Sequence, residues 1–579
     1  MSGFTASLLQ TLLVLGLSIA LAYPLAAYLE AVYDGRPFWA RRLLGPVEKG
    51  IYRVAGGAAR EDMDWKSYAL NFLGFNVLGA VTLYLLLPLQ GHLPFNPEHF
   101  PGMSSVMAFN TAASFVTTTN LQDYGGESTL SYLSQALGLA QQNFLAGASG
   151  AATLLALTRA FMRRKGKGLG NFWVDVTRTV LYLFLPVAAI FALFYVQQGA
   201  IQNLAAYVHA DLIQPFVYDG RGVHQQVLAM GPAASQEAIT ILGGNGGAFF
   251  NGGAAHPFAN PSPLSNLGQM LSFILFPTAY IFLFGRMLGR RRLAWAILAT
   301  TVLLWLPLSL SSQYFELQGN PRLPASVAQE ALPLYAGGGD LEGVDLRFGA
   351  GACGLFGSLA ATTGAGMSGC AYDSAAPMSS GINMLYMQLG ELLYGGIGVG
   401  LESFLAVMIF AVFLAGLMTG RTPVFLGKKI EAYDVKMVSF AILLMPLLVL
   451  LTTALAVALP AGRESVFNPG PQGFSEILYE FSSAVNNNGS DMGGLNVNTS
   501  FYNLLSALAM LFGRYFGILP LLALAGSLVC KQGTAVGAAT LREDSPLMIV
   551  FVALVILLLA AVTFFPALAL GPIAAQWSL

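Results

Sequence analysis

Charged side chains are scarce in this sequence: Asp, Glu, Lys and Arg make up 10% of its 579 residues, whereas hydrophobic residues make up 55%. Soluble domains carry about 25% charged residues, because their surfaces face water. The composition therefore excludes a soluble enzyme. The net charge of −1 gives no indication of a nucleic-acid partner, and none is expected.

Cysteine and histidine are also rare. The three cysteines, Cys353, Cys370 and Cys530, lack the spacing of metal ligands, so we expect them to be small apolar filling residues. The five histidines are scattered, and the polarity of loops explains them better than a zinc site does. They are His92, His99, His209, His224 and His256.

Long apolar runs are what the sequence has instead. A helix needs about 20 mostly apolar residues to cross a bilayer. Ten runs have this length: Phe4–Leu29, Ser67–Leu89, Ser128–Thr158, Phe172–Val196, Leu264–Phe284, Leu293–Leu310, Gly381–Thr419, Met437–Leu459, Tyr502–Val529 and Pro546–Leu570. The sequence therefore predicts an all-α polytopic membrane protein with about ten transmembrane helices.

The basic residues between these runs predict the topology. Of the 28 Lys and Arg residues, 23 fall in five alternate loops, around Arg36–Lys66, Arg159–Arg178, Arg286–Arg292, Arg421–Lys436 and Lys531–Arg542. The opposite loops hold only Arg221, Arg322, Arg347 and Arg463. The positive-inside rule therefore places both termini on the extracytoplasmic side. The first 35 residues contain no Lys or Arg, which argues against a signal peptide with a basic leading region.

Four polar or glycine-rich turns recur along the chain. They are "TTTNLQ" (117–122), "LGGNGGAFFN" (242–251), "TTGAG" (362–366) and "VNNNG" (485–489). With Asn120, Asn245, Ala365 and Asn488 as markers, the separations are 125, 120 and 123 residues. So constant a period indicates internal duplication. We expect four pseudo-symmetric membrane–pore–membrane repeats around a central selectivity filter, framed by one extra helix at each end.

The period sets the expected boundaries. Residues 1–66 form the first helix and its cytoplasmic loop, and residues 545–579 form the last helix. The four pore repeats occupy 67–171, 172–292, 293–436 and 437–544, and the third has a long, broken second helix.

A short apolar segment precedes each turn. These segments are Ser104–Val116, Ala233–Leu242, Ala352–Ala361 and Ser475–Val485. They reach roughly 15–20 Å, about half of the hydrocarbon thickness, so each must enter and leave the membrane on the same side. Irregular backbone at that depth must be buried in protein or line a cavity. A single glycine-rich turn is commonly a plain loop, but four at nearly constant spacing argue against that interpretation.

The turns themselves predict an ion-binding site. Glycine lets successive carbonyls point in one direction, and rings of carbonyls replace the hydration shell of potassium in known filters. The threonines and asparagines of the turns either brace the backbone or add oxygen ligands. No ring of Asp or Glu occurs in the turns, so potassium fits better than calcium. Potassium at this filter is the only metal ion expected.

Five blocks of the sequence resemble the potassium-binding A subunit of the Kdp potassium-transporting ATPase, a family of transporters with four membrane–pore–membrane repeats. The blocks are "TTTNLQDYGGES", "GGNGGAFFNGGAAHPFANPSPLSN", "MQLGELLYGGIGVGLE", "GLMTGRTPVFLGKKIEAYDVK" and "SSAVNNNGSDMGGLN". The resemblance covers essentially the whole chain. It implies a multi-pass protein of the bacterial inner membrane that binds potassium from outside and passes it through an intramembrane tunnel to a P-type ATPase B subunit.

The resemblance also implies a C subunit and, in many bacteria, a small F subunit as partners. The chain itself has no Asp-Lys-Thr-Gly phosphorylation motif and no Walker-type loop, so it is expected to bind no nucleotide and to be non-catalytic. The alternative function is a stand-alone potassium channel or cation symporter of the same architecture. The long blocks and the extra terminal helices favour the pump subunit.

Carried over by position, the resemblance implies thirteen filter residues. They are Thr118, Thr119, Asn120, Gln122, Gly244, Asn245, Gly246, Gly364, Ala365, Gly366, Asn487, Asn488 and Gly489. Two departures concern side chains only: Gly244 stands where relatives often carry threonine, and Gly364–Gly366 where many carry a Ser-Cys-Gly type sequence. Backbone ligands survive both changes, whereas selectivity over rubidium or ammonium is less secure.

An open filter would leak, so we expect an obstruction below it. The run Gly381–Thr419 contains Gly395, Gly396, Gly398 and Gly400, and each glycine costs roughly 1 kcal/mol in a helix interior, which predicts a broken helix there. Close helix packing through small residues is the alternative. Arg514 lies inside an apolar run, where an unpaired charge costs at least about 2.5 kcal/mol. We expect it to face the ion path as a barrier partnered by Glu391; a structural, snorkelling Arg is the alternative.

Several other charged residues have less definite roles. Glu402 flanks the glycine cluster. Glu237 and Glu480 fall in short pore segments, where either could bond a backbone amide behind the filter or line the outer vestibule. Arg421, Lys428 and Lys429 are expected at the inner surface, where contact with anionic lipid is possible.

Overall fold

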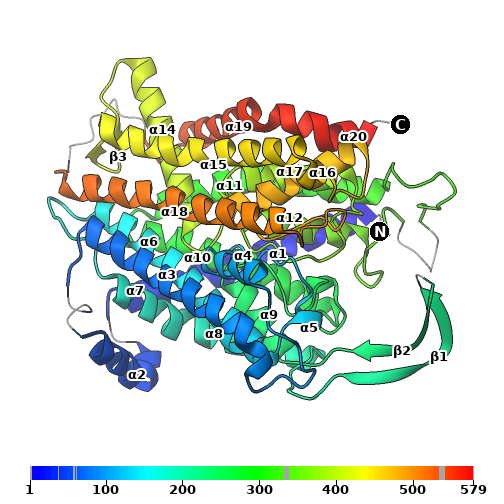
Figure 1. Cartoon of the computed structure of the whole chain (residues 1–579). Coiled ribbons are helices and arrows are strands. Elements are labelled where there is room, and N and C mark those ends of the chain that lie inside the picture. Colours follow the sequence, from blue (N-terminus) through cyan, green and yellow to red (C-terminus); the bar gives the residue numbers. More distant parts are fainter. Residues whose placement is uncertain are drawn as a thin grey trace.

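Long helices that run side by side dominate the molecule (Figure 1). The computed structural model describes residues 3–577 apart from 37, 57–58, 60, 219, 332–337 and 534–541. Within these residues, the helices long and apolar enough to cross a membrane are Gly3–Tyr33, Trp65–His92, Ser134–Met162, Phe172–Gln198, Pro263–Met287, Arg291–Gln318, Val399–Thr419, Ala432–Ala458, Ser500–Cys530 and Pro546–Trp577. The prediction of an all-α polytopic membrane protein with about ten spans is confirmed. Arg60 and part of the loop Lys531–Arg542 lie outside the described residues.

Several of these spans contain more than one helical element. The elements of the ten spans are α1 (Gly3–Tyr33), α3 (Trp65–Leu89) with η2 (Gln90–His92), η3 (Ser134–Ala140) with α6 (Gln141–Met162), α7 (Phe172–Arg178) with η4 (Thr179–Phe184) and α8 (Leu185–Gln198), α10 (Pro263–Met287), α11 (Arg291–Gln318), α14 (Val399–Thr419), α15 (Ala432–Ala458), α18 (Ser500–Cys530), and α19 (Pro546–Leu568) with η6 (Ala569–Ile573) and α20 (Ala574–Trp577). The π-helical turns η3 and η4 continue the helix axis without ending the span.

Local sequence signals set where several spans begin. Asp64, Ser262 and Ser545 each accept a hydrogen bond from a backbone amide in the first turn of α3, α10 and α19, respectively. Such N-caps satisfy amides that have no partner within the helix. Pro263 and Pro546 occupy the first position of α10 and α19, where their missing N–H costs nothing.

Among the described residues, a shorter helix precedes each of the four turns. They are α4 (Ser105–Val116), α9 (Ala233–Leu242), α12 (Ala350–Thr362) and α17 (Gly470–Asn486). Each is close to one of the predicted half-length segments, and α17 begins five residues earlier than expected, at Gly470 rather than Ser475. The residues that follow each short helix return toward the start of the next span, so the irregular backbone lies inside the bundle.

The second helix of the third repeat is interrupted. Helix α13 (Pro377–Gln388) ends at Gln388, and α14 begins at Val399. We call residues 389–398 the α13–α14 break. Gly390, Glu391, Tyr394 and Gly398 all have positive φ, which no α-helix accommodates. The corresponding spans of the other repeats, η3 with α6, α10 and α18, run without such a gap.

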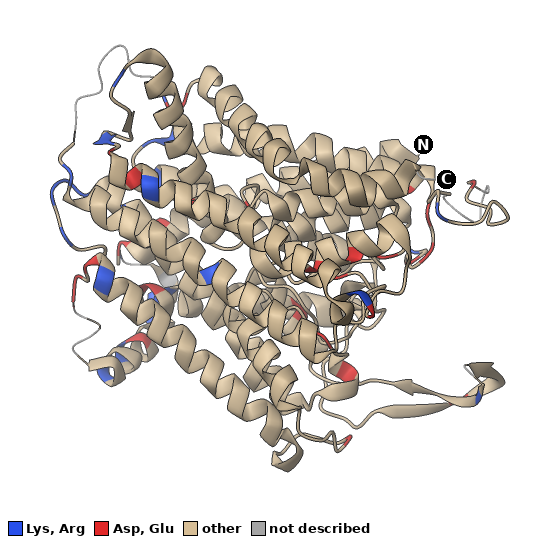
Figure 2. Cartoon of the chain, turned by 45° about the horizontal axis from the view of Figure 1, so that its top comes forward, with Lys and Arg blue, Asp and Glu red and all other residues tan. Residues whose placement is uncertain are grey.

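The two ends of the bundle differ in charge. Both termini lie at one end, which we call the terminal end, and Lys and Arg gather at the opposite end, which we call the basic end (Figure 2). The basic end includes helix α2 (Trp39–Ala55) and the small hairpin of β3 (Val424–Phe425) and β4 (Lys428–Lys429). Remaining short helices are α5 (Gly126–Thr129), η5 (Gly253–Ala255) and α16 (Pro460–Arg463).

An antiparallel ribbon of β1 (Val208–Tyr218) and β2 (Arg221–Leu228) projects from the terminal end (Figure 1). The sequence analysis predicted no strand there. Most side chains of both strands are exposed, so the segment carries no core-facing alternation by which it could have been recognised.

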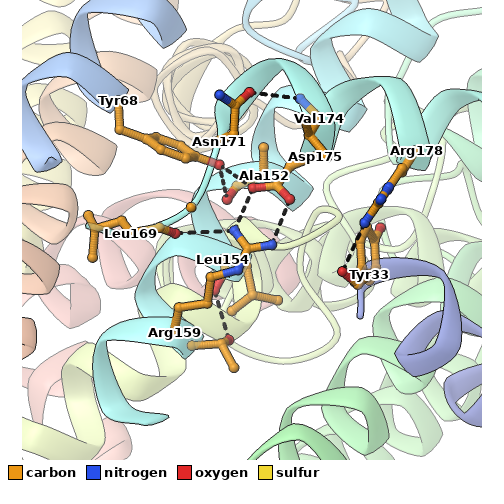
Figure 3. Close-up of polar contacts among 12 residues, drawn as sticks. Tyr33, Tyr68, Ala152, Leu154, Arg159, Leu169, Asn171, Val174, Asp175 and Arg178 are labelled. Atoms are coloured by element: carbon orange, nitrogen blue, oxygen red, sulfur yellow. Dashed lines mark hydrogen bonds and ion pairs between the residues drawn. The ribbon is translucent and has the colours of Figure 1, made fainter. Parts of the chain in front are cut away.

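A buried polar cluster lies near the basic end, where α6, α7 and α3 meet (Figure 3). Arg159 of α6 forms an ion pair with Asp175 of α7, and the Tyr68 hydroxyl lies 2.9 Å from the same carboxylate. Arg159 also donates to the Leu169 carbonyl at 3.2 Å. These contacts connect the loop after α6 to the start of the next span.

The expectation for the cysteines is wrong. Cys353 in α12 and Cys370 in the segment after its turn form a disulfide, with their Cα atoms 5.7 Å apart. The reason is the re-entrant path of the chain, which brings together two residues 17 positions apart in sequence. Cys530, at the end of α18, is free and exposed and therefore fills no core space.

Candidate ion-binding site

The four turns after the short helices share one backbone conformation. In each turn, the first residue after the helix with positive φ lies in the left-handed region. In chain order, these residues are Thr118 (φ 65°), Gly244 (φ 65°), Gly364 (φ 67°) and Asn487 (φ 59°). In three turns the next amide donates back to a helix carbonyl: Thr119 to Ser114 at 3.0 Å, Asn245 to Thr240 at 3.1 Å and Asn488 to Ser483 at 2.9 Å. This is the bond pattern of a Schellman helix end. Three of the four short helices therefore end by the same local mechanism, and the fourth, α12, shares the left-handed residue.

This shared geometry corrects the register of the first repeat. The residue equivalent to Asn245, Ala365 and Asn488 is Thr119, and the marker Asn120 is one residue too late. The separations are then 126, 120 and 123 residues. Asn120 corresponds instead to Gly246, Gly366 and Gly489, so three of these four positions are glycine.

The turns converge closely around Gly246. A Cβ atom added there would lie 2.5 Å from the Asn488 carbonyl oxygen and 2.7 Å from that of Thr119. It would also lie 3.1 Å from the Gly366 amide nitrogen. Backbone from all four repeats therefore meets at one place, and only glycine leaves enough space at this position.

Gly489 is equally constrained. Its φ is +100°, and an added Cβ would collide with the Thr119 carbonyl. The Asn488 carbonyl accepts a hydrogen bond from the Gly366 amide at 2.9 Å, which links the third and fourth turns directly. A carbonyl oxygen has two lone pairs, so this bond leaves one available for a cation.

Asn143 braces the first two turns, and sequence reasoning missed it. Its Oδ1 accepts from Asn120 Nδ2 at 2.7 Å, its Nδ2 donates to Thr240 Oγ1 at 2.8 Å, and its carbonyl accepts from Asn245 Nδ2 at 3.0 Å. Gln122 adds a further link, since its Oε1 accepts from the Ala248 amide at 2.8 Å. The available signal was a polar "QQN" stretch (141–143) within an apolar span.

The fourth turn is braced by its own asparagines. Asn487 Nδ2 donates to Thr119 Oγ1 at 2.9 Å and to the Met510 carbonyl at 3.0 Å. Asn488 Nδ2 donates to the Ala360 carbonyl at 3.0 Å, and its Oδ1 accepts from Ser490 Oγ at 2.6 Å. The side-chain amides of the turns thus bond to neighbouring protein groups.

The α13–α14 break lies directly against the turns. A Cβ atom on Gly396 would lie 3.9 Å from the Thr363 carbonyl and 4.0 Å from that of Gly244. A Cβ atom on Gly244 would lie 3.1 Å from Ile397 Cγ1, which accounts for glycine at that position. A Cβ atom on Gly364 would collide with the carboxylate of Glu391, whose Oε2 accepts from the Gly396 amide at 3.2 Å.

A cavity of about 100 Å³ opens beside the break. Glu391, Arg514, Ser403 and Asn487 are among its lining residues. Arg514 is only 4% exposed, and its guanidinium lies near Gly150 of α6. In the part of the chain that the structure describes, no ion pair within 4.0 Å joins Arg514 to Glu391, so the two charges share a cavity without direct contact.

Gly395 and Gly398 occupy tight positions in the break. A Cβ atom added to Gly395 would collide with the Glu391 carbonyl, and one added to Gly398 would collide with the Gly150 carbonyl. Gly398 also has φ +86°, so a larger residue would be strained there regardless of space. Glu402, one turn into α14, is buried and interacts with the Thr153 hydroxyl of α6.

Glu237 and Glu480 are both buried. The Ser506 hydroxyl of α18 donates to Glu480 Oε1 at 2.6 Å, so this carboxylate bonds a side chain rather than a filter amide. The Glu237 carboxylate interacts with the backbone of Phe249, just after the second turn. Asp123, directly after the first turn, is 5% exposed, and neither of its carboxylate oxygens has a hydrogen-bond partner within the described residues.

Within the described residues, ten membrane-capable helices and four short helices whose turns meet at one centre define an ion-transport membrane protein. The family model of the potassium-transporting ATPase A subunit (KdpA) matches residues 12–577. The chain belongs to this family, as the sequence blocks predicted.

Curated relatives and a solved structure are also similar to the chain. The potassium-transporting ATPase potassium-binding subunit of Chromobacterium violaceum is 46% identical, with 98% of each chain covered. The protein of the same name from Burkholderia mallei is 48% identical, over 98% of this chain and 97% of its own. Among solved structures, the potassium transporter TrkH from Vibrio parahaemolyticus has a TM-score of 0.49 at 15% identity, covering 77% of this chain and 83% of that chain.

Proposed function

We propose that this chain is the potassium-binding and translocating subunit of an ATP-driven, high-affinity potassium uptake pump. The names of its relatives support this function, because they describe a potassium-binding subunit of a potassium-transporting ATPase. The observation that carries it is the convergence of the turns at Gly246. A Cβ atom added to this residue would lie 2.5 Å from the Asn488 carbonyl oxygen and 2.7 Å from that of Thr119. A ring of backbone carbonyls at such a centre suits a dehydrated monovalent cation.

In this proposal, backbone carbonyls are the ligands and side chains hold them in place. The amides of Asn120, Asn245, Asn487 and Asn488 already donate to neighbouring protein atoms, which supports a bracing role. The residues proposed for the filter are Thr118, Thr119, Asn120, Gln122, Gly244, Asn245, Gly246, Gly364, Ala365, Gly366, Asn487, Asn488 and Gly489. The short helices direct the negative ends of their dipoles at the same centre, which also favours a cation.

The α13–α14 break and Arg514 are proposed as the barrier below the filter. The close approach of Gly396 and Ile397 to the carbonyls and backbone of the second and third turns supports an obstruction on the axis. Arg514 would add a positive charge beside it. The cavity that both Glu391 and Arg514 line would be the beginning of a lateral tunnel toward the ATP-hydrolysing partner.

The proposed partners are a P-type ATPase B subunit, a C subunit and a small F subunit, in the bacterial inner membrane. The proposed orientation places the terminal end outside the cell. Two observations support it: Lys and Arg gather at the basic end (Figure 2), and the Cys353–Cys370 disulfide begins in the first turn of α12, where Gly351 lies against Ser7 near the N-terminus at the terminal end. Disulfides persist in oxidising compartments, whereas the exposed Cys530 at the basic end is reduced.

The site is tested by Gly246→Asp. A carboxylate at this position would occupy the space of the ion and displace the neighbouring carbonyls. We expect the potassium concentration for half-maximal ATPase activity of the purified complex to rise by at least about tenfold, equivalent to about 1.4 kcal/mol. The matched control is Gly493→Asp, since an added Cβ at Gly493 meets no atom within 4 Å. Unchanged potassium affinity in Gly246→Asp would show that the second turn is not part of the site.

A second experiment separates a pump subunit from a stand-alone channel or symporter. Cells lacking other potassium uptake systems would express the chain together with its neighbouring subunits. Potassium uptake is expected to stop when ATP is depleted while the membrane potential is clamped. Uptake that continues under these conditions would assign the chain to the channel or symporter class.

A further inference from the structure

Helix α2 (Trp39–Ala55) presents an apolar stripe that nothing in the chain covers among the described residues. Leu43 is 75% exposed and Val54 is 92% exposed, and Val47 and Ile51 lie between them at 48% and 40%. Their spacing of four, four and three residues places them along one side of the helix. On a water-facing helix these positions would be polar.

A different side of α2 packs against the bundle. Glu48 is buried on this side, and its carboxylate accepts from Arg178 Nε at 3.1 Å, from the Tyr182 hydroxyl at 2.7 Å and from the Tyr52 hydroxyl at 2.9 Å. Directly before α2, the Phe38 ring packs edge-on against Tyr182 with centroids 4.8 Å apart. The position of α2 is therefore fixed by specific contacts.

These contacts place α2 at the level of the membrane boundary. Arg178 and Tyr182 lie within the span Phe172–Gln198, about 9 and 15 Å along the helix from its start at 1.5 Å per residue. The same span begins beside Trp173, a residue type enriched at membrane interfaces. In Figure 1, α2 lies next to α7 at the level where α3 begins. Its stripe thus lies beside the span and not in the aqueous space beyond it.

The third side of α2 is basic. Arg42, Lys49 and Arg53 are exposed, and on a helical wheel they lie about 100–180° away from the apolar stripe. The helix contains one acidic residue, Glu48, and the ion pair with Arg178 already neutralises it. An apolar side, a basic side and low overall hydrophobicity are the features of helices that lie in the plane of an anionic membrane.

We propose that α2 is an interfacial helix that binds the inner leaflet of an anionic bilayer. Leu43, Val47, Ile51 and Val54 insert among the acyl chains, and Arg42, Lys49 and Arg53 bind the phosphates of lipid headgroups. Lipid fits better than a protein partner because the adjoining span presents bare apolar side chains from close to its contact with α2 to its far end: Leu185, Ile190 and Leu193 of α8 are 46%, 66% and 72% exposed. The stripe of α2 continues the surface on which lipid must already lie.

Insertion is tested with the full chain, alone and within its assembled complex, in nanodiscs. Cys530→Ser removes the exposed free thiol, and an environment-sensitive fluorophore is attached to Val54→Cys or, as the matched control, to Lys49→Cys. With acyl-brominated lipid, the label at Val54 is expected to emit at shorter wavelength and to be quenched several-fold more strongly than the label at Lys49. Water-like emission and equal, weak quenching at both positions would overturn the proposal. Quenching that disappears in the assembled complex would show that a protein subunit occupies the stripe instead.

The role of the basic side is tested by Arg42→Gln/Lys49→Gln/Arg53→Gln in the Val54-labelled protein. Brominated phosphatidylglycerol and brominated phosphatidylcholine are titrated separately, and the ratio of their half-quenching concentrations is measured. Each removed charge is expected to reduce the preference for the anionic lipid by about fivefold. Glu431→Gln, an exposed change elsewhere at the basic end, is the control and leaves the ratio unchanged. A ratio unaffected by the triple substitution would overturn the headgroup assignment.

Discussion

Arg159 and Asp175 form a two-pronged ion pair near the basic end of the bundle, with Nη1–Oδ2 at 2.6 Å and Nη2–Oδ1 at 2.7 Å (Figure 3). Both side chains are largely buried, at 16% and 2% exposure. A buried pair of this kind contributes little compared with apolar packing, but the loss of one partner leaves an uncompensated charge. The pair therefore makes the junction between the first two repeats sensitive to single substitutions.

Asp175→Asn is predicted to lower the free energy of unfolding by about 3–5 kcal/mol, because the buried guanidinium of Arg159 keeps its charge and loses its counter-ion. Thermal unfolding of the purified protein in detergent measures the change. The matched control is Asp62→Asn, which breaks a more exposed ion pair: Arg163 is 37% exposed and Asp62 is 56% exposed. This substitution is expected to lower the free energy of unfolding by less than about 1 kcal/mol. Equal effects of the two substitutions would contradict the prediction.

Asn143→Ala is predicted to weaken potassium binding without contacting the ion. The substitution removes the amide that joins Asn120 and Thr240 and leaves buried polar groups unpaired, at about 1–3 kcal/mol for each. The first two turns lose their common support, so the potassium dependence of ATPase activity shifts to higher concentration and discrimination against rubidium falls. Gln141→Ala, exposed on the same helix, is the control. A normal potassium dependence in Asn143→Ala would assign this residue to packing alone.

Arg514→Ala is predicted to let potassium leak through the chain. Removal of the guanidinium takes a positive charge from the wall of the cavity beside the break, so the electrostatic barrier to a cation falls. Passive potassium efflux from proteoliposomes without ATP measures the leak. Arg463→Ala, at the terminal end, is the control for the loss of one Arg. Efflux equal to that of the unsubstituted protein would leave Arg514 a structural role.

Loss of the Cys353–Cys370 disulfide is predicted to destabilise the third repeat. A bridge that closes a loop of 17 residues contributes about 3 kcal/mol by restricting the unfolded chain. We expect a reductant to lower the thermal unfolding temperature of the unsubstituted protein and to have no effect on Cys353→Ala/Cys370→Ala. Cys530→Ala should behave like the unsubstituted protein. A reductant-insensitive unfolding temperature in the unsubstituted protein would contradict the prediction.

The membrane-spanning architecture could be predicted because its signals are local. A span such as Pro263–Met287 is recognisable from its length and hydropathy alone, and α9 could be identified at Ala233–Leu242 because it is too short to cross. The β1–β2 ribbon could not be predicted, since its exposed strands show no alternation toward a core. The amphipathic α2 was also missed, because an interfacial helix is neither long nor apolar enough to count as a span.

The candidate site could be predicted only in outline. Glycines such as Gly246 indicated where the backbone comes close, but the register of the first turn depended on Thr118, whose left-handed conformation is uncommon for a β-branched residue. Asn143 and the Cys353–Cys370 disulfide each join segments that only the fold brings together. Such contacts cannot be predicted from a single sequence.

The single interruption between α13 and α14 makes the rotational symmetry of the bundle incomplete. Three of the four repeats surround the centre with continuous helices, namely η3 with α6, α10 and α18. The third repeat instead presents the irregular backbone of the α13–α14 break and the carboxylate of Glu391. Under the proposed function, an ion below the centre would meet one polar side and three apolar sides, which favours a lateral exit over a straight one.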